Sequence, residues 1–239
     1  MRGKKNNKPF VLKQFEVMHH LCAHKVGFDA VLLGAWADFT NAESVLDVGT
    51  GSGIIALMAA QKNSQCLVHA IELDENSFIQ ARENFFKSKW RERLTLIPGD
   101  FFEWKVDQKF DHIVTNPPYF INALETPVEN RTTARHFTNE RFAAFMLKTT
   151  EMLNPLGRFT LIIPAMHSHE ILSCINHAGY YLSRKCMIYT KNEQKPERIL
   201  VECRLKKCDV GENKLFIYDK TGQHSAEYRK LTSEFYLNF

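Results

Sequence analysis

A strand that must end abruptly is the feature that most constrains the fold of this chain. Residues 110–115 form a largely apolar run, and Asn116, Pro117, Pro118 and Tyr119 follow it. Proline has no N–H for a strand ladder, so the sheet has to stop here. A residue before proline is held extended, so the side-chain oxygen of Asn116 and the carbonyl of Pro117 can face one point, with the Tyr119 ring beside it. Two acceptors and a ring suit a planar amino group such as that of a nucleobase; a proline-terminated strand with a core tyrosine is the alternative.

Upstream of this element, strand-like and helix-like runs alternate. We expect strands at residues 44–48, 66–71, 94–97 and 110–115, and helices at residues 28–39, 54–62 and 75–87. Strands separated by helices at this spacing indicate βαβ units and a parallel, doubly wound sheet.

The remaining segments add to this core. We expect a short strand outside the main sheet within residues 10–17, a long polar connection at 120–137, a helix at 139–153 that ends at Asn154-Pro155, a strand at 158–163, a helix at 168–177, an antiparallel hairpin at 180–190 and 198–206, and a short strand with an amphipathic stretch within 215–239. The prediction is an α/β fold with a mostly parallel sheet and an antiparallel C-terminal hairpin. We expect one domain over residues 1–239, in which residues 1–40 form an N-terminal arm and a helix that precede the core.

Positive charge is concentrated at the N-terminus. The formal net charge of the 239 residues is +4, which permits a polyanionic partner without requiring one. Five basic residues precede the first acidic residue, Glu16: Arg2, Lys4, Lys5, Lys8 and Lys13. Such an arm is either a solvated tail or a nucleic-acid contact.

Cysteine usage and hydropathy indicate a cytoplasmic protein. The six cysteines, at positions 22, 66, 174, 186, 203 and 208, contain no C-x-x-C pair and mostly have apolar neighbours, which is typical of buried thiols in a reducing compartment. The basic N-terminus lacks the apolar region of a secretory signal, and the longest apolar run, residues 30–37, is too short to span a bilayer. We therefore expect no membrane partner.

A glycine-rich turn joins the first expected strand of the core to the helix that follows. Gly49, Gly51 and Gly53 alternate there, which lets a ligand approach the backbone and the helix N-terminus closely. The spacing is G-x-G-x-G, not the dinucleotide fingerprint G-x-G-x-x-G. Glu72 ends the second strand, where an acidic residue can accept hydrogen bonds from ribose, and Asp100 with Phe101 follows the third. Taken alone, the carboxylate of Glu72 or of Asp100 could equally be a helix cap or a solvent-facing group.

These motifs, in this order, resemble the class I S-adenosylmethionine (SAM) methyltransferases that act on planar amino nitrogens. The N-P-P-Y element narrows the set to N6-adenine, N2-guanine and glutamine-amide N5 enzymes. Nearly the whole chain is similar to the bacterial tRNA1(Val) adenine N6-methyltransferase family, which modifies the adenine immediately 3′ of the anticodon. The segments that carry this similarity are Phe15 and residues 22–29, 32–36, 116–120, 129–131, 134–136, 227–228 and 235–237. His24 and Phe28 depart from it, because methionine and threonine are expected there.

The resemblance implies a role for each matching residue. SAM is the implied cofactor, with Gly49, Thr50, Gly51 and Gly53 around its methionine moiety, Glu72 on its ribose, Asp100 and Phe101 around its adenine, and Phe28 and Asp29 on its methionyl side. Asn116 and Pro117 accept the two hydrogens of the target amine, and Tyr119 stacks on the flipped base. The implied partner is the anticodon loop of tRNA, for which the candidate contacts are Lys4, Lys5, Lys8, Phe120, Arg131, Arg135 and His136. A second basic surface is possible at Lys185, Lys191, Lys195 and Arg198; ordinary surface charge is the alternative for all of these basic residues.

Other chemistries lack a motif. Residues 167–170, His-Ser-His-Glu, do not form H-E-x-x-H, and no Cys/His cluster accompanies Cys203 and Cys208, so we expect no metal. Residues 50–53 are not a nucleophile elbow, and the glycine spacing disfavours a nicotinamide enzyme. Three hypotheses stay open: a tRNA adenine N6-methyltransferase, an N2-guanine or glutamine N5 enzyme with the same chemistry, and a non-catalytic binding module. The sequence leaves the oligomeric state open.

Overall fold

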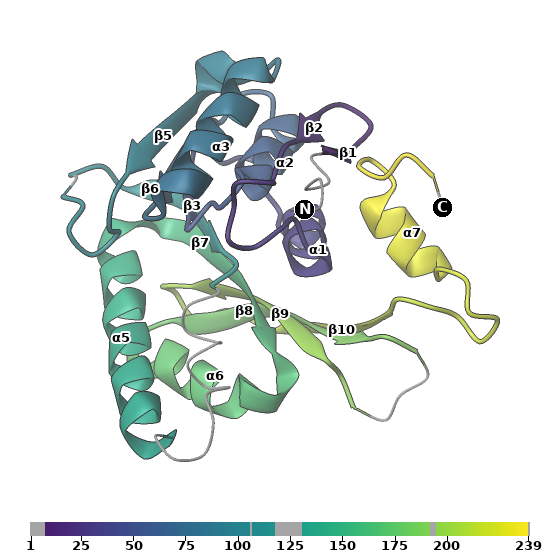
Figure 1. The fold of residues 1–239 in the computed structure, drawn as a ribbon. Helices are drawn as coiled ribbons and strands as arrows, with labels where there is room; N and C mark the ends of the chain where they lie inside the picture. Colours follow the sequence, from purple (N-terminus) through teal and green to yellow (C-terminus); the bar gives the residue numbers. More distant parts are fainter. Residues whose placement is uncertain (1–7, 106, 118–130, 192–194, 239) are drawn as a thin grey trace. The chain divides into compact units, whose positions relative to one another are not determined.

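The structure is a computed structural model that describes residues 8–105, 107–117, 131–191 and 195–238, with side chains in the helix that starts at residue 131 described from residue 140 on. The chain divides into two compact units (Figure 1). The first comprises residues 1–105 and 229–239, and the second comprises residues 106–228. Each unit is described by itself.

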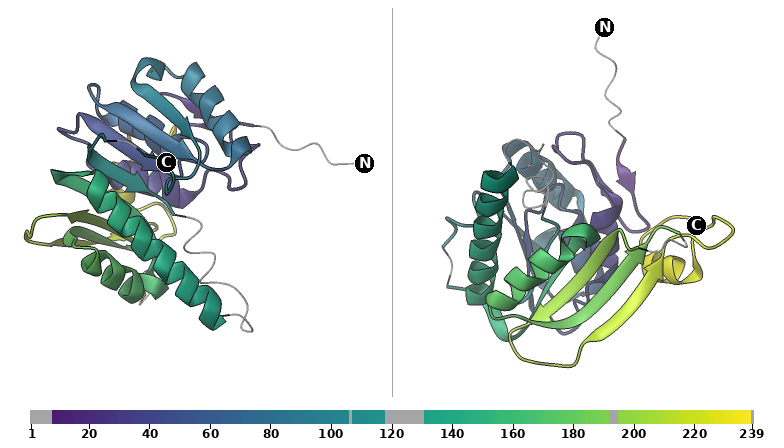
Figure 2. Two further views of the ribbon diagram at one scale, coloured as in Figure 1. Left: turned by 90° about the vertical axis from the view of Figure 1, so that its left-hand side faces the viewer. Right: turned by 90° about the horizontal axis from the view of Figure 1, so that it is seen from below.

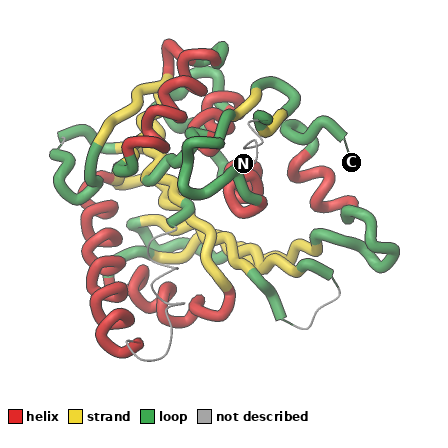
Figure 3. Tube along the Cα trace, viewed as in Figure 1, coloured by secondary structure: helices red, strands yellow, loops and turns green. Residues whose placement is uncertain are grey.

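The first unit is built on a parallel three-stranded sheet. Strand β4 (Leu67–Glu72) pairs with β3 (Ser44–Val48) on one side and with β5 (Leu94–Pro98) on the other. Helix α2 (Ile54–Lys62) connects β3 to β4, and α3 (Glu75–Lys87) leads through the 3-10 turn η1 (Arg91–Arg93) into β5. Figure 3 colours these helices red and these strands yellow. Val45 and Leu46 are fully buried, as expected for strands covered on both faces.

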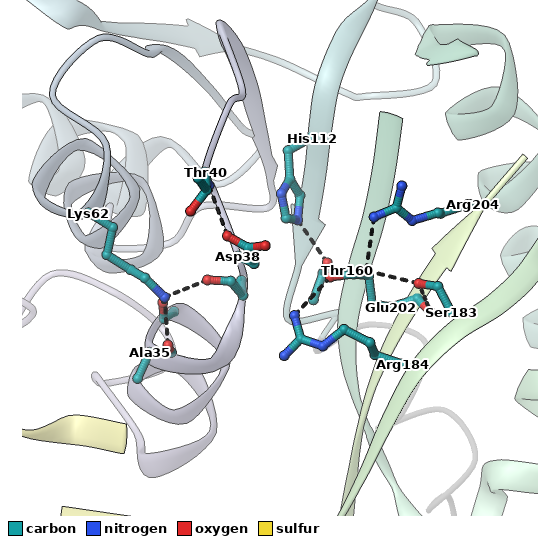
Figure 4. A network of polar contacts seen from close by, with 12 residues as sticks. Ala35, Asp38, Thr40, Lys62, His112, Thr160, Ser183, Arg184, Glu202 and Arg204 are labelled. Carbon is teal, nitrogen blue, oxygen red and sulfur yellow. Dashed lines mark hydrogen bonds and ion pairs between the residues drawn. The ribbon is translucent and has the colours of Figure 1, made fainter. Parts of the chain in front are cut away.

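Two helices of this unit are almost entirely buried. In α1 (Phe28–Trp36) residues 30–36 are buried, and in α2 residues 54–60 are buried. A helix that is apolar all round belongs inside a protein. The end of α1 is fixed by Lys62, whose ammonium donates to the carbonyls of Ala35 at 2.6 Å and Ala37 at 2.5 Å (Figure 4). A cation at these carbonyls also stabilises the helix dipole.

The N-terminal and C-terminal segments meet within the first unit. Strands β1 (Phe10–Val11) and β2 (Glu16–Val17) form a separate antiparallel pair outside the main sheet, where we expected one short strand. The amide of Lys13 donates to the carbonyl of Phe235 at 2.8 Å. That carbonyl follows α7 (Ala226–Thr232), the last helix that the structure describes.

The second unit holds a five-stranded mixed sheet. Strand β7 (Leu153–Pro164) pairs in parallel with β6 (Phe110–Thr115) and antiparallel with β9 (Arg198–Arg204). Strand β8 (Tyr181–Tyr189) pairs antiparallel with β9, which confirms the expected hairpin, and β10 (Gly211–Phe216) adds in parallel to β8. Helices α5 (Arg131–Met152) and α6 (Ser168–His177) pack against each other beside this sheet, and the 3-10 turn η3 (Ala165–His167) precedes α6 (Figure 2).

Two polar clusters inside this sheet are held by hydrogen bonds. His112 Nε2 lies 2.8 Å from Thr160 Oγ1 across β6 and β7. Glu202, only 1% exposed, accepts from Ser183 Oγ at 2.9 Å and from the Arg184 guanidinium at 3.1 Å (Figure 4). A buried carboxylate without such partners would be strongly destabilising.

The expected starts of one helix and one strand were wrong. Helix α5 begins at Arg131, so residues 131–137 are helical and do not belong to a loop; residues 118–130 lie outside the described part of the chain. Strand β7 begins at Leu153 and contains Pro155, where we expected a helix to end and the strand to start only at residue 158. The pairing register with β6 shifts between Phe110 and His112, and a bulge of this kind is where a sheet tolerates proline.

Three further findings concern the cysteines, membrane-spanning helices and metal ligands. All six cysteines are free, and Cys22, Cys66, Cys186 and Cys203 are buried, whereas Cys174 is partly exposed and Cys208 is exposed. Within the described ranges, no helix has the length and apolarity to cross a membrane, and no group of three or more His, Cys, Asp or Glu side chains is placed to hold a metal ion.

Candidate active site

The glycine turn between β3 and α2 leaves its backbone open. Gly49 and Thr50 donate to the carbonyl of Ile71 at 2.9 and 3.1 Å, which fixes the turn beside the end of β4. Gly51 has φ +58°, and a Cβ added there would meet no atom within 4 Å. Gly53 has φ +85°, and its Cβ would lie 2.5 Å from the Phe85 ring. Gly53 is therefore required for packing on α3, whereas Gly51 borders open space that a ligand can fill.

Asp47 supports this turn from inside. Its Oδ2 accepts from Thr50 Oγ1 at 2.6 Å and from the amide of Ala56, in the first turn of α2, at 3.1 Å. Its Oδ1 is buried and has no hydrogen-bond partner among the described residues. Burial raises the pKa of Asp47 to about 7; the bonds from Thr50 and Ala56 oppose this shift, and the nearby charge of Glu72 adds to it.

Replacing Asp47 with asparagine should change how stability depends on pH. The pKa of Asp47 is about 7 in the folded state against a reference value of 3.8, so the folded state holds the proton longer and wild-type stability falls as pH rises from about 4 to about 7. Asparagine does not titrate, so the variant should gain on the order of 4 kcal/mol relative to wild type across that window and nothing further above it. Urea unfolding at several pH values measures this. Asp107→Asn, at an exposed position, is the control, and a parallel pH profile for Asp47→Asn and wild type would contradict the expectation.

Glu72 lies against the glycine turn. The side chain is 5% exposed; its Oε2 accepts from the amide of Gly51 at 2.7 Å and its Oε1 from that of Asp74 at 2.8 Å. Burial raises the pKa of Glu72, and these backbone bonds partly offset the rise. Neither alternative from the sequence applies: Glu72 does not face solvent, and the cap of α3 is Asp74, whose Oδ1 accepts from Ser77 N at 2.8 Å. Each oxygen of Glu72 keeps a second lone pair for a ligand hydroxyl.

Asp100 and Phe101 stand at the neighbouring strand end. The amide of Gly99 donates to the backbone carbonyl of Glu72 at 2.9 Å, which holds the segment after β5 beside the end of β4. Asp100 is half-buried and accepts from Phe102 N at 2.8 Å, and Phe101 is 6% exposed. Glu72 and Asp100 therefore share the carboxyl edge of the sheet, where open α/β folds bind ligands.

Two predicted cofactor residues lie in the first turn of α1. Phe28 is 38% exposed and Asp29 is half-buried. The other end of α1 is anchored to α2 by Lys62, so this first turn is carried on a fixed helix.

In the second unit, the predicted acceptor element ends β6 as expected. Thr115 is 2% exposed, Pro117 is buried and Asn116 is half-exposed. No hydrogen bond joins the Asn116 amide to the described residues, so its oxygen is available. Tyr119 and Phe120 lie outside the described part of the chain, as do Lys4 and Lys5, while Lys8 is exposed. Arg131, Arg135 and His136 are on the first turns of α5, and their side chains are outside the description.

Two buried side chains were not among the sequence candidates. Asp47, two residues before Gly49, could have been found from its position at the start of the glycine motif. Asn84 is 2% exposed: its Oδ1 accepts from Met18 N at 2.9 Å, and its Nδ2 donates to the carbonyls of Met18 and Ser52, both at 2.8 Å. One amide thus ties the N-terminal segment to the glycine turn. No local pattern marks it, because its partners are distant in the chain.

The site fits SAM, a sulfonium cation that carries a ribose. Asp47 Oδ1 is a buried oxygen without a partner, Glu72 is a buried carboxylate with spare acceptor capacity, and Gly51 borders open space. Fold and site together define a SAM-dependent methyltransferase of the α/β class.

Comparisons with known proteins agree. The family model described as "Methyltransferase small domain" matches residues 29–173. Proteins named tRNA1(Val) (adenine(37)-N6)-methyltransferase are 36% identical in Histophilus somni, with 96% of this chain and 98% of the relative covered, and 39% identical in Bacteroides fragilis, with 95% and 97% covered. The chain belongs to the methyltransferase small domain family and, within it, to the family of these relatives.

Solved structures support the fold. A predicted O-methyltransferase from Agrobacterium tumefaciens superposes with a TM-score of 0.65 at 17% identity, covering 87% of this chain and 96% of the other. The glycopeptide N-methyltransferase MtfA, in complex with SAM, superposes with a TM-score of 0.53 at 13% identity, covering 69% and 82%.

Proposed function

We propose that this protein transfers a methyl group from SAM to N6 of adenine 37 in tRNA1(Val). The observation that carries the proposal is the half-exposed Asn116 at the end of β6, which has no hydrogen bond to the described residues, in a chain that is similar over nearly its whole length to relatives of that name. The proposal assigns both units to one methyltransferase domain over residues 1–239, with residues 1–40 as its N-terminal arm and helix. It also places the protein in the cytoplasm, where tRNA is modified.

The cofactor residues of the proposal are those of the first unit. SAM supplies the methyl group, bound to a positively charged sulfur. Backbone groups of Gly49, Thr50, Gly51 and Gly53 hold its methionine part, and Phe28 and Asp29 border the methionyl side. Glu72 accepts from the ribose hydroxyls, and Asp100 with Phe101 holds the adenine. The buried Glu72 carboxylate and the open backbone at Gly51 support this assignment.

Asn116 and Pro117 prepare the nitrogen for reaction. The lone pair of an adenine amino group is delocalised into the ring, which makes the nitrogen a poor nucleophile. When the Asn116 oxygen and the Pro117 carbonyl accept its two hydrogens, the nitrogen can become pyramidal and direct its lone pair at the methyl carbon. Holding reactants in this geometry is worth roughly 7–11 kcal/mol in well-oriented systems. A neutral amide also avoids an unpaired buried charge.

Recognition of the base and of the RNA involves residues largely outside the described structure. Tyr119 stacks on the flipped base, which returns roughly 1–3 kcal/mol, about the cost of flipping. An unpaired anticodon-loop base lowers that cost. Lys4, Lys5, Lys8, Phe120, Arg131, Arg135 and His136 contact the surrounding RNA in this proposal.

Competition between acceptors tests the proposal. The purified protein is given labelled SAM with equal concentrations of unmodified tRNA1(Val), a ribosomal RNA fragment and a release factor. We expect label in tRNA as N6-methyladenosine, and a transcript with guanine at position 37 should accept none. Label in guanine N2 or in a glutamine amide would replace the proposal with one of the two related reactions.

Asn84 should act as a positioning residue for the cofactor. Asn84→Leu removes the three hydrogen bonds that bridge Met18 and Ser52, so we expect the Kd for SAM to rise about 10–50-fold, which corresponds to part of the energy of those bonds, while kcat at saturating SAM stays within about threefold. Asn63→Leu is the matched control, because the Asn63 amide also donates to two carbonyls, those of Phe39 and Ala42, away from the glycine turn. Calorimetric SAM binding on folded protein separates the two variants, and equal SAM affinities would show that Asn84 is only structural.

A further inference from the structure

The end of α3 and the turn after it present exposed positive charge. Within residues 82–93, all of which are described, four cations are exposed, against two exposed carboxylates, Glu83 and Glu92. The exposed cations are Arg82, Lys87, Lys89 and Arg91. Arg93 differs, because its guanidinium donates to the carbonyls of Ala60 at 2.7 Å, Cys66 at 2.8 Å and Asn63 at 2.9 Å and is used internally. Arg91 pairs with Glu92 at 3.0 Å, but both side chains are largely exposed, so this ion pair stays accessible to a ligand.

Aromatic rings lie among these cations. Phe86 is 72% exposed, and the Arg91 guanidinium lies 6.0 Å from its ring centroid. Trp90 is half-buried, and the Lys89 ammonium lies 5.0 Å from its ring centroid. A ring and a cation presented together match RNA, which offers phosphates and the flat faces of bases and sugars.

The turn between β1 and β2 is anchored at the same place. Lys89 Nζ donates to Gln14 Oε1 at 2.7 Å, and the rings of Phe15 and Trp90 meet edge to face at 5.5 Å. Gln14 and Phe15 lie in the turn between β1 and β2, so this turn is tied to the end of α3.

We propose that the surface formed by Phe86, Lys87, Lys89, Trp90 and Arg91, the α3-end surface, binds the sugar-phosphate backbone of the tRNA substrate away from the reacting base. Helix α3 has 13 residues, so it is roughly 20 Å long, and it starts immediately after the Glu72 edge. Its far end therefore lies well away from the Glu72 edge, so the part of the RNA that it binds is not the reacting nucleotide. The charge complementarity is with a polyanion, and the single exposed ring is too little for an apolar protein partner or a membrane. The inference rests on the proposed function.

The test compares two double variants that remove the same charge. Lys89→Ala/Arg91→Ala removes two cations of the α3-end surface, and Lys206→Ala/Lys207→Ala removes two exposed lysines of the second unit. We expect the first to weaken tRNA binding about 5–30-fold at 0.15 M salt and to reduce the slope of log K against log salt by about 2, with the SAM affinity unchanged. The control should stay within about twofold. Phe86→Ala should lower tRNA affinity about fivefold or more with an unchanged salt slope.

The outcomes separate this inference from the proposed function. Equal tRNA affinity and equal salt slopes for the two double variants, with active wild type, would overturn the α3-end surface alone. Failure of the wild type to bind or methylate tRNA would overturn the proposed function as well. Binding of anionic phosphatidylserine vesicles that depends on Lys89 and Arg91, without their effect on tRNA, would assign the surface to a membrane and contradict the inference.

Discussion

Replacing Asn116 with alanine is expected to lower kcat at least about a hundredfold while the affinity for SAM stays the same. The reason is that Asn116 supplies one of the two acceptors that localise the lone pair of the amine, and deleting one such preorganised group typically costs about 10²–10³ in rate. Single-turnover methyl transfer to tRNA, with SAM and tRNA both saturating, measures the chemical step directly.

Two further substitutions at this position separate acceptance from packing. Asn116→Asp keeps an oxygen acceptor and should lose less activity than Asn116→Leu, which fills the space but accepts nothing. A single-turnover rate for Asn116→Ala or Asn116→Leu within about threefold of wild type would remove Asn116 from the mechanism.

Replacing Glu72 with alanine is expected to raise the Kd for SAM at least about a hundredfold. A hydrogen bond to a charged acceptor contributes about 1.5–3 kcal/mol, and Glu72 has acceptor capacity for both ribose hydroxyls. The loss also frees the amide of Gly51, which now donates to Glu72 at 2.7 Å, so the turn itself becomes less ordered. Calorimetry on the purified variant gives the Kd.

The control for Glu72 is a carboxylate that is close in sequence and exposed. Glu75→Ala removes the same charge from the first turn of α3 without touching the glycine turn, and its Kd should stay within about twofold of wild type. If Glu75→Ala weakens SAM binding as much as Glu72→Ala does, long-range charge and not direct contact explains the effect of Glu72.

Elements with a strong local signal were predicted well from the sequence. The strands Ser44–Val48 and Phe110–Thr115 and the helices Ile54–Lys62 and Glu75–Lys87 have the expected bounds. Each is a buried run or an amphipathic pattern closed by glycine, by proline or by a cap such as Asp74. The edge that collects Glu72 and Asp100 also followed, because the carboxyl ends of parallel strands meet on one side of a sheet.

The predictions failed where distant contacts outweigh local pattern. The start of α5 was placed too late because residues 120–137 are mostly polar and because Thr132 and Thr133 disfavour a helix. Pro155 was expected to end a helix, but a bulge admits it into β7. The role of Asn84 depends on partners 32 and 66 residues away, so nothing near it in the sequence could reveal it.

The most direct test of the central claim is nucleoside analysis of tRNA1(Val) by mass spectrometry in a strain that lacks this gene. Adenine 37 should carry no N6-methyl group there. Expression of the wild-type chain should restore the methyl group, and expression of Asn116→Ala should not. An unchanged level of N6-methyladenosine at position 37 in the deletion strain, or full restoration by Asn116→Ala, would contradict the account.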